Sequence, residues 1–400
     1  MKKNLFFVIT LLTLFGSLNA QTIRPGVLVV GNSNAAVSAA LQSAMSGVET
    51  IILLQAGGFD ISPIDNDLSS GIQATFLKKI REAKQLKDSL QAVTFDKKLA
   101  NDILTTWTSS TKKLTVIKNT VWVKADGYVN SWVLKLSDGG TIRAKVLINP
   151  ADAKLNTALK INIATNSEPI KLAYVNTIYR TSVAAGMNNA NSTGNMFSMY
   201  QFFVPDQDNF IWIANPQSML IGQAAGATAA YAAFFDTKTS ASNLKKIQGE
   251  LISYKLDIMP FADVKQTDSN WKAIQFVGVT GVLKGETTGK LVNFYPNKLV
   301  STQEIKQPLK DFYYKAQIWF DDYKSDKITI GSAIDMICYV GAKSPESTKK
   351  ELLKKWNTNY QFKSALDFER QINRREFAVL LQDYMPPFNV NIDKNGKVVR

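Results

Sequence analysis

The feature that most constrains the fold is a short apolar run that ends in a glycine and leads directly into a helix of small residues. Residues 26–30 (GVLVV) predict a buried strand, and Val37–Ser46 predicts a helix that ends at Gly47. A second apolar run, Thr50–Leu54, predicts another buried strand. This close succession of strand, helix and strand indicates a βαβ unit with two parallel strands, and therefore an α/β fold.

The turn between the first strand and the helix has small residues where a dinucleotide-binding turn has the pattern G-x-G-x-x-G. The turn consists of Gly31, Asn32, Ser33, Asn34, Ala35 and Ala36. Gly31, Ser33 and Ala36 take the three glycine positions, which allow a sharp turn, close approach of a pyrophosphate and helix–strand packing. Gln55 stands where an acidic residue normally binds the adenosine ribose, and its amide bonds a hydroxyl less strongly. A βαβ unit that binds no nucleotide is the alternative interpretation.

A series of short strands follows. They are predicted at Leu114–Ile117, Val121–Ala125, Ser131–Leu136 and Thr141–Ile148. Asp126-Gly127 and Asp138-Gly139-Gly140 are predicted as hairpin turns between them. The pattern favours a β-meander followed by a returning strand, which is an insertion typical of flavoprotein Rossmann domains. The segment Thr181–Tyr200, rich in Asn, Ser, Gly and Met, is predicted to be a loop.

The order of these motifs resembles the FAD-dependent oxidoreductases found among exported bacterial enzymes. In that family one strand ends in a turn on the flavin side, and residues 149–155 (NPADAKL, with Asp152) correspond to this turn. Residues 219–226 (MLIGQAAG) correspond to the start of a helix whose N-terminus points at the flavin. The positions that the resemblance places beside the flavin are Gly222, Gln223, Ala224, Ala225 and Gly226. A helix of Ala and Gly that serves only packing is the alternative.

The resemblance does not extend to catalytic residues. The family has an Arg and a Glu just before the flavin helix, and the corresponding residues here are Trp212 and Ala214. The chain between the Asp152 turn and Gly222 is short for a substrate domain. Asp206 and Asp208 precede the helix and are interpreted as a solvated loop. No catalytic acid or base is therefore predicted.

The C-terminal third resembles an S-layer homology module. The matching elements, in order, are Phe261–Val264, a helix with Trp271, Val279–Gly285, Phe294–Asn297 and Val300–Glu304, with a second partial copy at Ile372–Leu381. The resemblance implies contact with pyruvylated cell-wall polymers through an arginine. Arg374 occupies this position in the second copy, whereas the first copy has Thr302 there. Ser301 and Asn373 are predicted helix caps, each with a Glu three residues later. A purely structural helical domain is the alternative.

Composition removes several classes of chemistry. The 400 residues contain no histidine and one cysteine, Cys338, which excludes histidine-dependent triads, zinc sites built on Cys or His and an intramolecular disulfide. Basic residues exceed acidic ones by 47 to 33, a net charge of +14. The lysines are scattered and no basic helix carries interleaved aromatic residues, so a nucleic-acid partner is not expected. General solubility can account for the charge, and contact with an acidic polymer is the alternative.

Residues 1–20 (MKKNLFFVITLLTLFGSLNA) have a basic start, an apolar run and a small residue at a suitable cleavage position. We expect a signal peptide, a mature chain that begins at Gln21, and a periplasmic or extracellular protein. A membrane anchor is the alternative, but the run is short for a bilayer and no later stretch is long enough to span one.

These observations predict four segments: a signal peptide (1–20), a Rossmann-type FAD-binding domain with a reduced substrate region (21–235), a linker helix (236–260) and a helical S-layer-homology-like domain (261–400). The predicted function is an exported FAD-dependent oxidoreductase that transfers a hydride between flavin and an unidentified small-molecule substrate. The alternative is a non-catalytic relative that binds or scaffolds at the cell envelope, in contact with a wall polymer or anionic glycan.

Overall fold

The computed structural model describes residues 22–64, 68–87, 93–163, 168–189, 192–214 and 217–399, so the predicted signal peptide lies outside the described residues. The elements of the first part are β1 (Thr22–Ile23), β2 (Val27–Val30), α2 (Asn34–Met45), β3 (Thr50–Leu54), α3 (Gly71–Ala83), α4 (Lys97–Ser110), β4 (Leu114–Lys118), β5 (Trp122–Tyr128), β6 (Ser131–Leu136), β7 (Thr141–Ala144), β8 (Val146–Pro150), α5 (Ala153–Ala158), β9 (Ile170–Lys171), β10 (Ser182–Asn189), β11 (Ser192–Ser198), β12 (Phe203–Val204), β13 (Gln207–Ile213) and α6 (Met219–Phe234).

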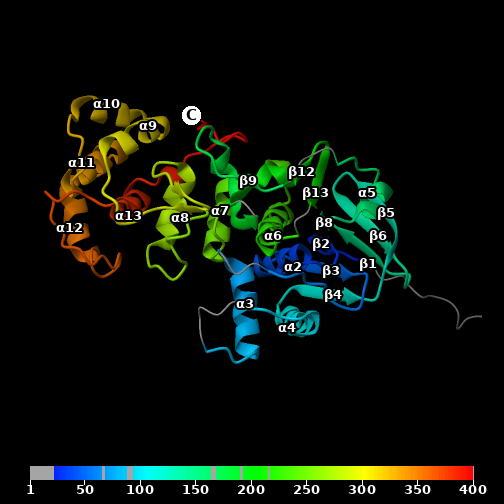
Figure 1. Ribbon diagram of the computed structural model, residues 1–400. Helices are drawn as coiled ribbons and strands as arrows, with labels where there is room; N and C mark the ends of the chain where they lie inside the picture. Colours follow the sequence, from blue (N-terminus) through cyan, green and yellow to red (C-terminus); the bar gives the residue numbers. More distant parts are fainter. Residues whose placement is uncertain are drawn as a thin grey trace, which may run out of the picture.

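The second part is mainly helical. Its elements are α7 (Leu244–Ser253), α8 (Trp271–Thr280), β14 (Glu286–Thr288), β15 (Leu291–Asn293), α9 (Thr302–Phe312), α10 (Tyr314–Asp322), α11 (Ile330–Gly341), α12 (Pro345–Lys355) and α13 (Arg374–Tyr384). In Figure 1 the parallel sheet lies at one end of the molecule and α9 to α13 at the other, with α7 and α8 between them. Within the described residues, no helix combines the length and apolar character needed to cross a membrane.

The principal sheet has the strand order β12-β13-β8-β2-β3-β4. The five strands from β13 to β4 are parallel, and β12 adds an antiparallel edge. The first strand of the sheet, β2, is central, with β3 and β4 on one side and β8 and β13 on the other. This order is that of a Rossmann-like dinucleotide-binding sheet, whose ligand crevice lies where the chain changes direction, beyond the carboxyl ends of β2 and β8.

Alternating side chains of each strand define the two faces of the sheet. Val27 and Val29 of β2 face one hydrophobic cluster, together with residues of α2 and α6. Leu28 and Val30 face a second cluster, to which the meander β5-β6-β7 contributes Trp132 and neighbouring residues. Both faces of the sheet are therefore covered, helices on one side and an antiparallel sheet on the other, which explains why its strands are continuous apolar runs.

Three sequence expectations for this region are wrong in detail. The predicted single strand Thr141–Ile148 divides at Lys145 into β7, in the meander, and β8, in the parallel sheet. Asp126-Gly127 is not a turn but part of β5, where the missing side chain of Gly127 leaves room for the Trp132 ring. The predicted loop Thr181–Tyr200 contains β10 and β11, which pair with each other. The turn at Asp138-Gly139-Gly140 is confirmed.

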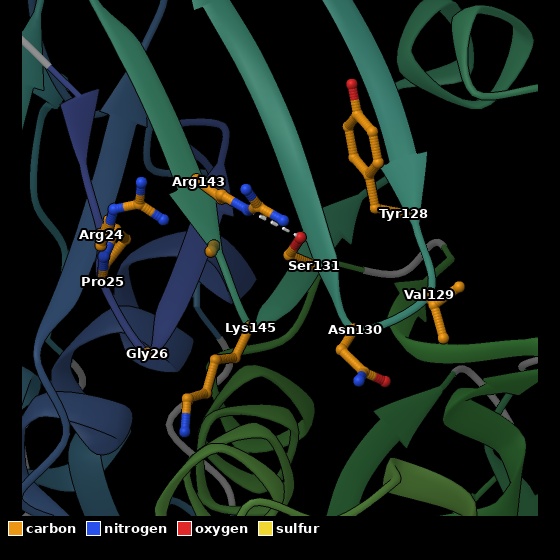
Figure 2. A pocket seen from close by; sticks show the side chains of 10 residues that line it. Arg24, Pro25, Gly26, Tyr128, Val129, Asn130, Ser131, Arg143 and Lys145 are labelled. Atoms are coloured by element: carbon orange, nitrogen blue, oxygen red, sulfur yellow. Dashed lines mark hydrogen bonds between the residues drawn. The ribbon is translucent and has the colours of Figure 1, made fainter.

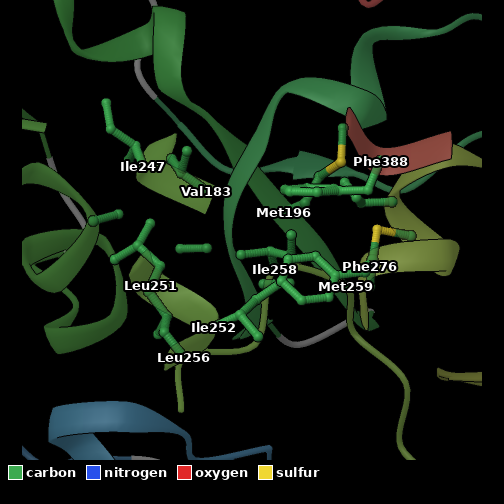
Figure 3. Packing of buried hydrophobic residues seen from close by; sticks show 14 of the residues in the cluster. Val183, Met196, Ile247, Leu251, Ile252, Leu256, Ile258, Met259, Phe276 and Phe388 are labelled. Atoms are coloured by element: carbon green, nitrogen blue, oxygen red, sulfur yellow. The ribbon is translucent and has the colours of Figure 1, made fainter. Parts of the chain in front are cut away.

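The sheet β9-β11-β10 and helix α7 join the two parts of the molecule through one apolar core. Ile247 and Leu251 of α7 pack there with Val183 of β10, beside Ile258 and Phe276 (Figure 3). The side chain of the buried Gln248 donates to the backbone oxygens of Arg180 (2.9 Å) and Ser182 (2.8 Å). The segment predicted as a linker helix (236–260) contains α7, and one face of α7 is buried in this core.

Three segments of the helical part meet before the starts of α9, α11 and α13. Bridges between residues near 300, 328 and 372 join them, including the backbone bond from Val300 N to Ile372 O (3.0 Å). Ser301, Thr329 and Asn373 each cap the helix that follows, which confirms the two predicted caps. The capping box is complete at Asn373, and the carboxylate of Glu304 accepts a hydrogen bond from Arg374.

Candidate functional site

The site that the sequence predicts lies at the carboxyl ends of the parallel strands, where β2 leads into α2. Gly31 has φ +142°, a backbone conformation that side-chain-bearing residues rarely adopt, and its N–H donates to Leu53 O on β3 (3.0 Å). A glycine is needed here for its conformational freedom, since a Cβ would meet only Ala36 and Pro150 at ordinary contact distances. The turn therefore brings the start of α2 directly over the end of its own sheet.

The N-terminus of α2 carries hydrogen-bond donors that the fold leaves open. Ser33 is the N-cap, and its hydroxyl accepts from Ala36 N at 3.3 Å. The N–H groups of Asn34 and Ala35 have no hydrogen-bond partner among the described residues. Both residues are buried, with exposed fractions of 6% and 0%. Because unpaired donors at a buried helix N-terminus are costly, this end is suited to an anion such as a phosphate.

A second helix N-terminus lies beside the first. Ser218 caps α6 by accepting from Leu220 N (3.1 Å), and the hydroxyl of Ser33 donates to Oε1 of Gln217, in the turn before α6, at 2.7 Å. The positive ends of two helix dipoles thus adjoin each other, which strengthens the attraction for a negative charge. Gln217 was not singled out in the sequence, because nothing local marks it as the partner of a residue so distant in the chain.

The two glycines of α6 bring the helices together. A Cβ on Gly222 would lie 2.7 Å from Ala35 Cα, and one on Gly226 would lie 3.0 Å from Ala39 Cα, both on α2. Gln223 is also an interior residue: Oε1 accepts from Ile72 N (2.8 Å) and Nε2 donates to Gln42 (2.9 Å). Gly222 to Gly226, including Ala224 and Ala225, are buried. In this structure Gly222 and Gly226 set the spacing between α2 and α6.

Gln55 and Asp152 lie on either side of the end of β2 and contact each other. Gln55 follows β3, Asp152 follows β8, and Nε2 of Gln55 donates to Oδ2 of Asp152 at 3.3 Å. Oδ1 of Asp152 caps α5 by accepting from Leu155 N (3.1 Å). The residue predicted to bind the ribose and the residue predicted on the flavin side are therefore neighbours. No donor among the described residues bonds Oε1 of Gln55, which is therefore the atom left to accept from a ribose hydroxyl.

The segment after β3 folds back over the glycine turn. Asp60 N donates to Asn32 O (2.9 Å), and Nδ2 of Asn32 donates to Gly58 O (3.2 Å). Asn34 bonds the backbone of Ser62 twice, through Nδ2 to the carbonyl (3.3 Å) and through Oδ1 from the N–H (2.9 Å). The side chains of Asn32 and Asn34 thus fix the segment 58–62 against the glycine turn.

The acid–base groups with shifted pKa values lie away from this turn. Asp208, near the amino end of β13, pairs with Lys238 (2.8 Å) and bonds Ser240, and these bonds lower the pKa of its carboxyl. Burial lowers the pKa of Lys245, on α7, to about 7 and raises the pKa of Asp257, which bonds Trp271, to about 7. Within the described residues no cluster of acidic, Cys or His side chains could hold a metal ion.

The arrangement fits the diphosphate and ribose of FAD. The open N–H groups of Asn34 and Ala35, beside the turn at Gly31, match a pyrophosphate, and Oε1 of Gln55 matches a ribose hydroxyl. Asp152 is the only titratable side chain among the predicted contacts. The site can therefore bind and orient a dinucleotide, but its own residues offer little proton-transfer chemistry.

The arginine that the C-terminal resemblance singled out is a buried residue. Arg374 is 1% exposed, Nη1 donates to Glu304 at 2.7 Å, and Nη2 donates to Lys284 O. Its guanidinium also lies 4.6 Å from the centroid of the Phe294 ring. This geometry gives Arg374 a packing role between α9 and α13.

No protein-family model matches the chain, and no curated protein matches it. Among solved structures, thioredoxin reductase from T. acidophilum shares 16% identity over 32% of this chain and 35% of its own, with a TM-score of 0.22. An oxidoreductase from Agrobacterium tumefaciens shares 14% identity over 32% of this chain and 36% of its own, with a TM-score of 0.22. The flavin-dependent monooxygenase PieE, in complex with FAD and substrate, shares 14% identity over 37% of this chain and 33% of its own, with a TM-score of 0.27. The chain spans about a third of the length of these proteins. The Rossmann-like character of the sheet is inferred from its strand order and not from these similarities.

Proposed function

We propose that this chain is an exported flavoprotein that binds FAD noncovalently at the carboxyl edge of its parallel sheet and acts as an oxidoreductase. The observation that carries the proposal is the pair of adjoining helix N-termini, one of which presents unpaired, buried N–H groups beside a glycine turn. A diphosphate would satisfy those donors and neutralise the positive ends of two helix dipoles.

Each contact has a specific task in this proposal. The N–H groups of Asn34 and Ala35 bind the diphosphate, Gly31 lets it approach the backbone, and Oε1 of Gln55 accepts from the ribose. Asn32 holds the covering loop through its bonds to residues 58–60. When bound, a flavin supplies the hydride-transfer chemistry, and the protein supplies binding, orientation and exclusion of water.

The test is addition of FAD to the purified mature chain, followed by its visible spectrum and its thermal melting temperature. FAD at a hundred times its dissociation constant should add about 2.7 kcal/mol of stability, and the melting temperature should rise. Gly31→Val should abolish retention of the flavin. Gly139→Val is the matched control, because Gly139 also has positive φ but lies in an open turn far along the chain. If FAD shifts the melt of neither the natural protein nor Gly139→Val, the proposal is wrong.

The contact between Gln55 and Asp152 affects the FAD affinity expected when a glutamate is introduced at the ribose-binding position. Gln55→Glu alone would place two carboxylates beside each other, and their repulsion would offset the stronger ribose bond. Gln55→Glu combined with Asp152→Asn keeps one acceptor and one donor in the pair. The double variant should therefore bind FAD more tightly than the natural protein, and Gln55→Glu alone should bind it less tightly than the double variant.

A non-catalytic relative is the second candidate function, and one observation favours it. Ser33, Asn34 and Gln55 all use side-chain atoms for bonds within the chain, to Gln217, Ser62 and Asp152 respectively. A site closed by its own residues would serve to stabilise a scaffold at the cell envelope. Absence of any response to FAD, together with binding of the purified chain to isolated cell walls, would favour this candidate.

We also propose export, with the mature chain beginning at Gln21, and contact of residues 261–400 with an anionic wall polymer. The charge and hydropathy pattern of residues 1–20 supports the first proposal, and the excess of 22 basic over 16 acidic residues in 261–400 supports the second. The N-terminal sequence of the protein isolated from the cell exterior tests export. Co-sedimentation with purified cell walls at low and high salt tests wall contact, which should weaken as salt increases.

A further inference from the structure

A separate hollow lies at the opposite end of the parallel strands, where the amino ends of β2 and β8 meet the meander. It has a volume of about 650 Å³ and is bounded by residues 24–26, the hairpin turn 128–131 and residues 143–145 (Figure 2). That volume is within the range of small-molecule sites, roughly 300–1,000 Å³. Because Gly31 stands at the other end of β2, the hollow is distinct from the proposed flavin site.

The hollow is positively charged. Arg24, Arg143 and Lys145 belong to its wall, and none of its ten lining residues is acidic. Lys145 pairs with Asp236 outside the wall, at 2.6 Å. Within the described part of the chain neither arginine has a carboxylate partner. Like charges gathered in a concave surface concentrate the field and attract a multivalent anion.

Arg143 is held ready for such a ligand. Its Nε donates to Ser131 Oγ at 3.0 Å, and its guanidinium lies 5.5 Å from the centroid of the Tyr128 ring. Its backbone pairs with Val133 within the meander, so the side chain rises from a hydrogen-bonded strand. Figure 2 shows the guanidinium directed across the hollow toward Ser131. Neither terminal amino group of Arg143 has a hydrogen-bond partner among the described residues, and together they form the fork that binds carboxylates and phosphates bidentately.

We propose that this hollow binds a small multivalent oxyanion, a phosphate ester or a polycarboxylate. Arg143 makes the bidentate contact, and Arg24 supplies the second positive charge. Tyr128, 57% exposed at the rim, offers a flat surface for the organic part of the ligand. Neutralisation of two neighbouring guanidinium groups provides the driving force, so binding weakens as ionic strength rises.

The test is isothermal titration calorimetry of the full mature chain with pyrophosphate and, separately, with citrate. We expect saturable binding of at least one probe, with an affinity about tenfold lower in Arg143→Gln, the loss of one charge-assisted contact. Arg143→Lys keeps the charge but not the fork, and should also bind more weakly than the natural protein. Binding of both probes indicates a general oxyanion site. Binding of one probe identifies the ligand class, phosphate for pyrophosphate and polycarboxylate for citrate.

A control variant shows whether the measured binding belongs to this hollow. Lys135→Gln removes one charge at the far end of the same hairpin and should leave the affinity unchanged. If Arg143→Gln fails to fold, as judged by its thermal melt, Arg24→Gln takes its place. Absence of saturable binding, an affinity unchanged in Arg143→Gln, or equal loss in Lys135→Gln would overturn the proposal.

Discussion

Gly226 offers a sharp test of how the two helices at the flavin edge are held together. The change is Gly226→Ala, which adds one methyl group to the middle of α6. That methyl would lie 3.0 Å from Ala39 Cα and closer still to its carbonyl oxygen, whereas ordinary contact begins at 3.4 Å. The atoms it meets belong to the backbone of a helix, so α2 and α6 must move apart along their buried contact.

The expected magnitude follows from two opposing effects. Alanine is a better helix former than glycine by about 1 kcal/mol. Overpacking of a buried contact costs about 1–3 kcal/mol or more, and here the backbone cannot swing aside as a side chain would. The free energy of unfolding should therefore fall by about 2 kcal/mol. Gly249 in α7 is the matched control, because a Cβ there would meet nothing within 4 Å, and Gly249→Ala should be stabilising by about 0.5–1 kcal/mol.

The assay is urea unfolding of both variants without added FAD, followed by circular dichroism. The two changes should shift the midpoint in opposite directions, Gly226→Ala to lower urea and Gly249→Ala to slightly higher urea. If Gly226→Ala is as stable as Gly249→Ala, helix packing does not require this glycine. Close approach to a cofactor, which the family resemblance implies, would then account better for Gly226.

Two further predictions concern buried charges. The carboxyl of Asp257 accepts hydrogen bonds from Trp271 (2.7 Å) and Gln266 (3.1 Å). Burial raises its pKa to about 7, so the native state holds a proton that the unfolded state releases near pH 4. Stability should fall as pH rises from about 4 to 7, by at most about 1.4 kcal/mol per pH unit, and Asp257→Asn should remove this dependence in urea unfolding series. Arg374→Gln leaves Glu304 half-buried without its cation and should cost about 3 kcal/mol, part of which Glu304→Gln should restore. A double variant no more stable than Arg374→Gln alone would contradict a stabilising role for the ion pair.

Sequence reasoning was most successful where structure is decided by neighbours in the chain. The strand Thr50–Leu54 was predicted with its observed bounds, because five consecutive apolar or β-branched residues favour a buried strand. The caps at Ser301 and Asn373 were predicted because a short polar side chain reaches the N–H three residues later.

Sequence reasoning was least successful where distant segments decide the outcome. The segment Thr181–Tyr200 has little β-propensity, yet β10 and β11 form there because Asn195 bonds Met187 O and apolar neighbours are covered by α7. No local signal shows that Lys145 is the point where the chain leaves one sheet for another. A change of sheet depends on which strands lie alongside, and those come from other parts of the sequence.

The candidate site shows the same division. The sequence by itself determined the glycine turn at Gly31 and the order of strand, turn and helix, since backbone freedom and hydropathy are properties of each residue. Only the tertiary structure decided that Gln55 meets Asp152 and that Ser33 meets Gln217. Those pairs form because parallel strands end at one edge of a sheet, which brings together side chains that are far apart along the chain.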